Sequence, residues 1–93
     1  MPSQDTSLLE LKNLGSASVN ILRAIGINTF QDLEQVGAVE AYCRIKNRGI
    51  HVSKVMLYAL QGALMDLHWN ELPGEMKTQL VNQAESELTS ESA

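Results

Sequence analysis

The sequence predicts an all-α fold, a compact bundle of five to six helices around one long apolar helix. Apolar residues recur at three- and four-residue spacing, and they do not alternate with polar ones as a half-buried strand requires. Glycines and capping residues divide the chain into short segments. The chain has 93 residues and is 44% hydrophobic, enough for one domain with its own core.

The first predicted helices are short and are separated by a turn that contains glycine. We expect a helix over residues 8–12, which Asn13 and Gly15 end because both residue types tolerate left-handed backbone angles. A second helix, capped by Ser16, is expected to continue to about Ile25. Together these segments form a helix-hairpin-helix-like element at the N-terminal end of the domain.

Two further helices follow in the middle of the chain. Thr29 is the expected cap of the third helix, with Asp32 in the capping-box position and Gly37 at its end. The fourth helix is expected over residues 38–48. Its last turn is rich in cations, which suit the negative end of the helix dipole.

The fifth predicted helix is the long central one. Ser53 should cap it, and residues 54–68 are apolar on nearly every side, which is typical of a buried helix. Gly62 in its interior costs about 1 kcal/mol relative to alanine, so we expect it to admit the close approach of another helix. A last helix is expected from Gly74 to Ala84 or beyond, with Pro73 at its first position.

We predict one domain over residues 7–88, with a disordered start at 1–6 and a frayed tail at 89–93. The start lacks the features of a signal peptide, and no apolar stretch approaches the roughly 20 residues that span a bilayer. The single cysteine, Cys43, allows no internal disulfide, which suits a reducing compartment. We therefore expect a cytoplasmic protein without membrane contact.

The charge is unevenly distributed along the chain, whose net charge is −4. Residues 12–54 carry six cations against three anions (6 − 3 = +3), whereas residues 55–93 carry one against six (1 − 6 = −5). An anionic partner should therefore meet the first half. The possible basic patch consists of Arg44, Lys46, Arg48 and Lys54.

The segment "L-x-N-L-G-x-x-S" before an apolar helix has the form of a helix-hairpin-helix element. In such elements the unpaired backbone N–H groups at the start of the second helix attract a phosphate, without reading the base sequence. No cation follows Gly15 directly, which lowers the expected affinity for DNA. The possible phosphate or DNA contacts are Lys12, Asn13, Gly15, Ser16, Ala17 and Arg23.

The remaining chemistry-bearing residues predict neither catalysis nor a cofactor. Cys43, His51 and His68 do not have zinc-site spacing, and the carboxylates are scattered, so we expect no metal and no enzyme activity. Trp69 has two interpretations: it closes the core at the corner after the long helix, or it is an exposed anchor for a partner protein.

Several segments together resemble the C-terminal domain of the TfoX/Sxy family of bacterial competence regulators. They are the NLG hairpin, "GI-x-T-F-x-D-L", "GAVEAY", "LYALQGAL" and "HWNELP", which follow one another from about Leu11 to Pro73 and beyond. The resemblance implies a positive regulator of natural transformation genes that acts with the cyclic-AMP receptor protein. It also implies an N-terminal domain in full-length members, so this chain is either a separate domain or a stand-alone short member. It carries over no catalytic residues.

Three functions follow from these observations. The first, which we favour, is a regulatory interaction domain of a competence regulator that acts mainly through protein contacts. The alternative is a module that contacts DNA nonspecifically through the backbone amides near Gly15, and for the isolated domain we expect such binding to be weak or absent. The third is a purely structural or oligomerising domain.

Overall fold

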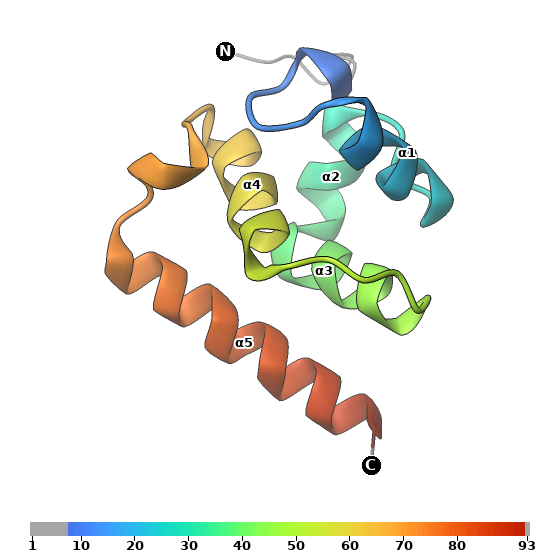
Figure 1. The fold of residues 1–93 in the computed structure, drawn as a ribbon, viewed down its shortest axis with the longest axis vertical. Coiled ribbons are helices and arrows are strands. Elements are labelled where there is room, and N and C mark those ends of the chain that lie inside the picture. Colours follow the sequence, from blue (N-terminus) through green and yellow to red (C-terminus); the bar gives the residue numbers. More distant parts are fainter. Residues whose placement is uncertain (1–7, 93) are drawn as a thin grey trace.

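The computed structural model describes residues 8–92, with side chains from Leu8 to Leu88, and every regular element in this range is helical. The elements are η1 (Leu8–Glu10), α1 (Ser16–Ala24), α2 (Phe30–Val36), α3 (Ala38–Asn47), α4 (Lys54–Met65), η2 (Trp69–Glu71) and α5 (Gly74–Ser92); η1 and η2 are 3₁₀ helices (Figure 1). This confirms the predicted all-α bundle. The start at 1–6 lies outside the described residues, as do the side chains from residue 89 on, so the frayed tail stays a prediction.

Local sequence signals set several helix boundaries. The predicted capping box of α2 is present: Thr29 Oγ1 accepts from the Asp32 N–H, and Asp32 Oδ2 accepts from the Thr29 N–H, both at 3.2 Å. Ser53 Oγ caps α4 by accepting from the N–H of Val55 at 3.3 Å. Gly37 adopts φ 85° and serves both as the end of α2 and as the start of α3. Such a left-handed angle favours glycine.

The C-terminal boundary of α4 differs from the prediction. The helix ends at Met65 rather than continuing to residue 68, because Asp66 adopts a left-handed conformation (φ 57°). The N–H of Leu67 then bonds back to the carbonyl oxygen of Gly62 at 2.8 Å, and the N–H of Asp66 bonds to that of Ala63 at 3.3 Å. This is the Schellman pattern that ends many helices, with aspartate in the position that glycine usually occupies.

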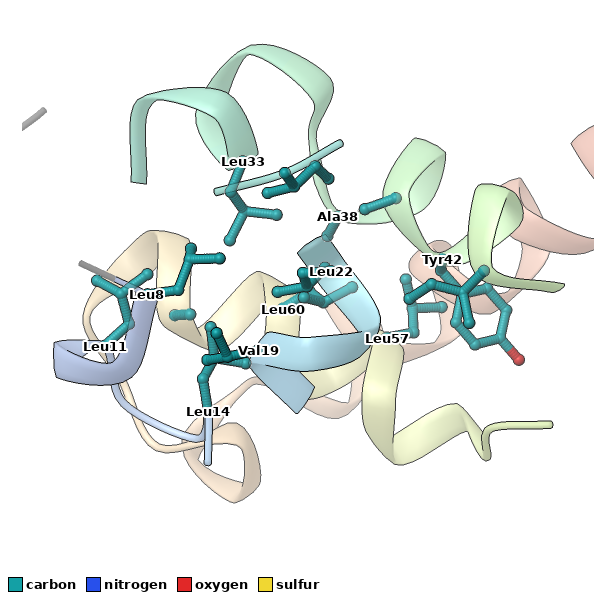
Figure 2. Close-up of a cluster of buried hydrophobic side chains, with 14 of the residues drawn as sticks. Leu8, Leu11, Leu14, Val19, Leu22, Leu33, Ala38, Tyr42, Leu57 and Leu60 are labelled. Atoms are coloured by element: carbon teal, nitrogen blue, oxygen red, sulfur yellow. The ribbon is translucent and has the colours of Figure 1, made fainter. Parts of the chain in front are cut away.

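The core is a single apolar cluster through which α4 passes. Figure 2 shows side chains of η1 and α1 pointing toward Leu60, while Tyr42 and Leu57 lie together at the other end of the cluster. The ends of α4 are less covered, since Val55 and Met65 are exposed. The largest fully buried side chains are Leu8, Val19, Leu22, Ile27, Leu33, Cys43, Ile45, Leu57 and Leu60.

The last helix, α5, lies against the outside of α3 and α4 (Figure 1). Only Leu80 and Ala84 of its described side chains are buried in the core cluster, and Val81 and Leu88 are partly buried against it. The thiol of Cys43 on α3 lies 3.7 Å from the carbonyl oxygen of Ala84, which marks where α3 and α5 approach closely. The outer position of α5 leaves a groove beside it.

Candidate functional site

Asn13, in the hairpin before α1, joins three parts of the chain. Its backbone is left-handed (φ 73°), as the sequence predicts. Its Nδ2 donates to the carbonyl oxygens of Leu67 at 2.9 Å and Ala59 at 3.3 Å, and its Oδ1 accepts from the N–H of Trp69 at 3.0 Å. We call these four residues the Asn13 clasp. Asn13, one of the residues considered for a phosphate contact, therefore uses its side-chain amide inside the fold.

Gly62 lies directly under the clasp. A Cβ at this position would be 2.6 Å from Asn13 Nδ2 and 2.7 Å from the carbonyl oxygen of Leu67, so no side chain fits without displacing them. The expected close approach at Gly62 exists. The two nearest atoms belong to the hairpin and to the segment that follows α4, and the Cα of Trp69, at the start of the 3₁₀ helix η2, lies 3.4 Å from the added Cβ.

The start of α1 corrects two expectations. Gly15 has extended backbone angles (φ −99°, ψ −176°) and open space around an added Cβ, so of the two residues expected to end the first helix through left-handed angles only Asn13 adopts them. Gly15, not Ser16, occupies the cap position, and no side chain caps α1. Gly15, Ser16 and Ala17 are all exposed. The N-terminal backbone of α1 therefore faces solvent, as a phosphate contact would require.

The two cations considered for the hairpin lie apart. Lys12 is exposed in the turn before α1, whereas Arg23 is exposed in the last turn of that helix. Seven residues separate Arg23 from Ser16, which corresponds to about 10 Å along a helix that rises about 1.5 Å per residue. The structure does not bring Arg23 to the exposed backbone at the start of α1.

The predicted basic patch divides into two parts. Arg44 donates from Nε to Glu40 Oε2 at 2.9 Å, while the Lys46 ammonium lies 5.5 Å from the centre of the Tyr42 ring. Arg44 and Lys46 are two residues apart, so they point to different faces of α3. Arg48 is exposed at the end of that helix.

Lys46 instead lies near Lys54, because both side chains border the same groove between α3, α4 and α5. Lys54 Nζ is 3.9 Å from Glu85 Oε1 on α5. The cavity has a volume of about 280 Å³, and we call it the α5 groove. Its lining residues are Tyr42, Lys46, Lys54, Leu57, Val81, Ala84, Glu85 and Leu88.

Trp69 forms a half-buried aromatic corner after α4. Its ring stacks on that of Tyr58, with centroids 6.3 Å apart and planes inclined by 18°. The Lys77 ammonium lies 5.3 Å from the Trp69 ring centre and 5.5 Å from that of Tyr58. Lys77 was not singled out from the sequence. Trp69 therefore closes the surface over α4, and its use as a partner anchor stays a prediction.

Two absences among the described residues bear on function. Among the side chains that the structure describes, no group of three or more His, Cys, Asp or Glu residues is placed to hold a metal ion. Between residues 8 and 92, none of the helices combines the length and the hydropathy needed to span a membrane.

Comparison with known proteins identifies the family. Residues 4–84 match the TfoX C-terminal domain. The chain belongs to this family. A crystal structure of an uncharacterized protein from Listeria monocytogenes, in a triclinic form, is similar, with 34% identity and a TM-score of 0.80 over 87% of this chain and 92% of that chain. A tetragonal form of a Listeria monocytogenes protein of unknown function gives 35% identity and a TM-score of 0.79 over 85% and 98%. No curated protein matches significantly.

In this TfoX C-terminal domain, the α5 groove brings together Lys46 and Lys54, whereas Arg44 and Arg48 of the predicted basic patch do not line it. Glu85 and Val81, which complete the α5 groove, were not singled out from the sequence. No local signal could have identified them, because three separate helices form the walls of the groove.

Proposed function

We propose that this domain is a regulatory interaction module of natural competence, which acts on transformation genes mainly through contacts with a regulatory protein. Membership of the TfoX C-terminal domain family supports the competence role. The partner implied by the resemblance is the cyclic-AMP receptor protein, alongside the N-terminal domain of full-length members. Such a module works in the cytoplasm and needs neither a cofactor nor catalytic residues.

The observation that favours protein contacts over DNA is the placement of the cations. Arg44, Lys46 and Lys54 each lie against an acidic or aromatic neighbour on the domain itself. Nonspecific DNA affinity depends on the number of phosphates neutralised, and it is typically about 10⁻⁴–10⁻⁶ M at physiological salt. With few cations available, we expect the isolated domain to bind DNA no more tightly than this range.

DNA contact through the hairpin is the second candidate function, and one observation favours it. The start of α1 is exposed and has no side-chain cap, so its first N–H groups can reach a phosphate. Two features oppose it: the Asn13 amide is used by the clasp, and Arg23 lies at the far end of α1.

Two titrations of the purified domain test the proposal. After nuclease treatment, we expect saturable binding to the purified cyclic-AMP receptor protein, measured by calorimetry. In parallel, we expect labelled duplex DNA to bind weakly in fluorescence anisotropy, with an affinity that falls steeply as salt is raised.

Lack of binding to the receptor protein would contradict the proposal for this partner. Submicromolar duplex binding that disappears in a folded Lys12→Glu, Arg23→Glu double variant would instead establish the hairpin as a DNA contact.

A further inference from the structure

We propose that the α5 groove binds an acidic peptide segment that inserts a large aliphatic side chain. The inference rests on the proposed function, because it names the kind of protein segment that the domain contacts. It uses a cavity in which an apolar floor and two cations of the basic half of the chain, Lys46 and Lys54, occur together.

The floor of the groove is suited to an aliphatic side chain. Leu57, Tyr42 and Ala84 lie at its base and are 0%, 6% and 1% exposed. Val81 and Leu88 of α5 are partly buried and form the apolar wall. At about 280 Å³ the groove is just below the roughly 300–1,000 Å³ of small-molecule sites. This volume suits one or two inserted side chains.

The rim of the groove favours an acidic ligand. Lys46 and Lys54 border it, and the single anion in its lining is Glu85 (2 − 1 = +1). The contact between Lys54 and Glu85 is long, at 3.9 Å, and both side chains are well exposed, at 60% and 64%. Exposed ion pairs of this kind are weak, so a carboxylate of the ligand can replace Glu85.

Nucleic acid fits this groove poorly. The Tyr42 ring is 6% exposed and Lys46 lies above it, so a base cannot stack on the ring as it does in single-strand-binding sites. A peptide needs no such stacking surface, because it can place its carboxylates beside the lysines and its apolar side chain on the floor.

The test uses a synthetic, helix-forming peptide with leucines on one face and glutamates on the other. Binding is followed by chemical-shift changes of the domain, and two control peptides carry lysine for glutamate or serine for leucine. We expect the shifts to concentrate on the groove residues and to be lost with either control. Equal binding of the lysine peptide, or shifts that concentrate elsewhere, would overturn the proposal.

Charge-reversal variants locate the contact. The double variant Lys46→Glu, Lys54→Glu should weaken peptide binding by about tenfold, since rim charges contribute modestly. The double variant Lys12→Glu, Arg23→Glu changes the net charge by the same amount on the α1 side. It should change the peptide affinity by less than about twofold. Equal losses of affinity in the two double variants would mean that only the overall charge of the domain matters. That result would contradict the proposal that the α5 groove binds the peptide.

A substitution at the exposed residue Glu85 tests the groove through a gain of peptide binding, without removing a buried side chain. Glu85→Gln frees Lys54 and should strengthen peptide binding by about two- to fivefold. Glu87→Gln on the same helix makes the same charge change away from the groove and should have less effect. Equal gains in the two variants would contradict the proposal, as would displacement of the peptide by duplex DNA or by a second copy of the domain.

These outcomes separate this inference from the proposed function. The receptor protein could bind the Lys46→Glu, Lys54→Glu double variant as tightly as the unchanged domain. In that case the α5 groove is not the contact surface, and the proposed regulatory function is unaffected. If instead the peptide binds the groove and the receptor protein does not bind the domain at all, the groove is a peptide-binding site and the proposed partner is wrong.

Discussion

The two ends of α4 are packed in opposite ways. Near its C-terminal end, the Asn13 clasp covers Gly62 so closely that a methyl group does not fit. At its N-terminal end, Lys54 is largely exposed and borders an open groove. One helix therefore combines an end that is fixed by the fold with an end that has room for a ligand.

The difference lies in the kind of interaction at each end. The clasp bonds to backbone groups of Ala59, Leu67 and Trp69 in a part-buried place, and removing the Asn13 amide takes a hydrogen-bond partner from the Leu67 carbonyl and the Trp69 N–H, at about 1–3 kcal/mol. The Lys54–Glu85 pair is exposed and contributes little. We therefore expect substitutions near the clasp to change stability, and substitutions at the groove to change binding instead.

The largest effect is expected between these two ends, at Leu60, which is fully buried. Leu60→Ala should lower the free energy of unfolding by about 2–5 kcal/mol, because it removes buried methyl groups and leaves a cavity. Val55→Ala at the exposed end of the same helix is the control and should change it by less than about 1 kcal/mol. Urea denaturation measures both. A loss below about 1 kcal/mol at Leu60 would mean that α4 is not central.

Gly62→Ala tests how tight the clasp is. Alanine is the better helix former by about 1 kcal/mol, yet the added methyl group would overlap Asn13 Nδ2 and the carbonyl oxygen of Leu67. We expect a net loss of about 1–3 kcal/mol in urea denaturation. The control is Gly74→Ala at the start of α5, where the space is open and no loss is expected. A stabilised Gly62→Ala would show that the clasp gives way easily.

The features that depend on neighbouring residues were predicted from the sequence, whereas those that depend on distant residues were not. The Thr29–Asp32 capping box and the cap at Ser53 were predicted correctly, because each depends on residues within one turn. The end of α4 was placed too late, since Leu67 continues the apolar pattern although Asp66 already turns the chain. The contact of Gly62 with Asn13 was not predicted, because Asn13 is 49 residues away in sequence (62 − 13 = 49). The groove depends on three helices and left no local signal.

A double-mutant cycle tests whether Asn13 and Gly62 act as one unit. Asn13→Gly keeps the left-handed turn but removes the amide, and it should cost about 1–2 kcal/mol because backbone groups lose their partners. In this background Gly62→Ala should cost less than it does alone, since one of the two overlaps is gone. Melting curves of all four proteins give the coupling energy, expected to exceed about 0.5 kcal/mol. Additive losses would mean that the two residues do not interact.

The smallest change in stability is expected on substituting Gly15. Its sign should be opposite to that of the same substitution at Gly26, the glycine of the turn at the other end of α1. Gly15 has extended backbone angles and open space, so Gly15→Ser adds a capping oxygen without strain and should stabilise the domain by a few tenths of a kcal/mol. Gly26 adopts φ 87°, so Gly26→Ser should destabilise it by about 1 kcal/mol. Thermal melts measure both changes. Gly15→Ser could abolish duplex DNA binding without lowering the melting temperature. This result would show that the glycine allows a phosphate to approach the backbone closely, and that the hairpin is the functional surface. If duplex binding is unaffected, the turn at Gly15 serves folding alone, and the groove at the opposite end of α4 is left as the surface for a partner.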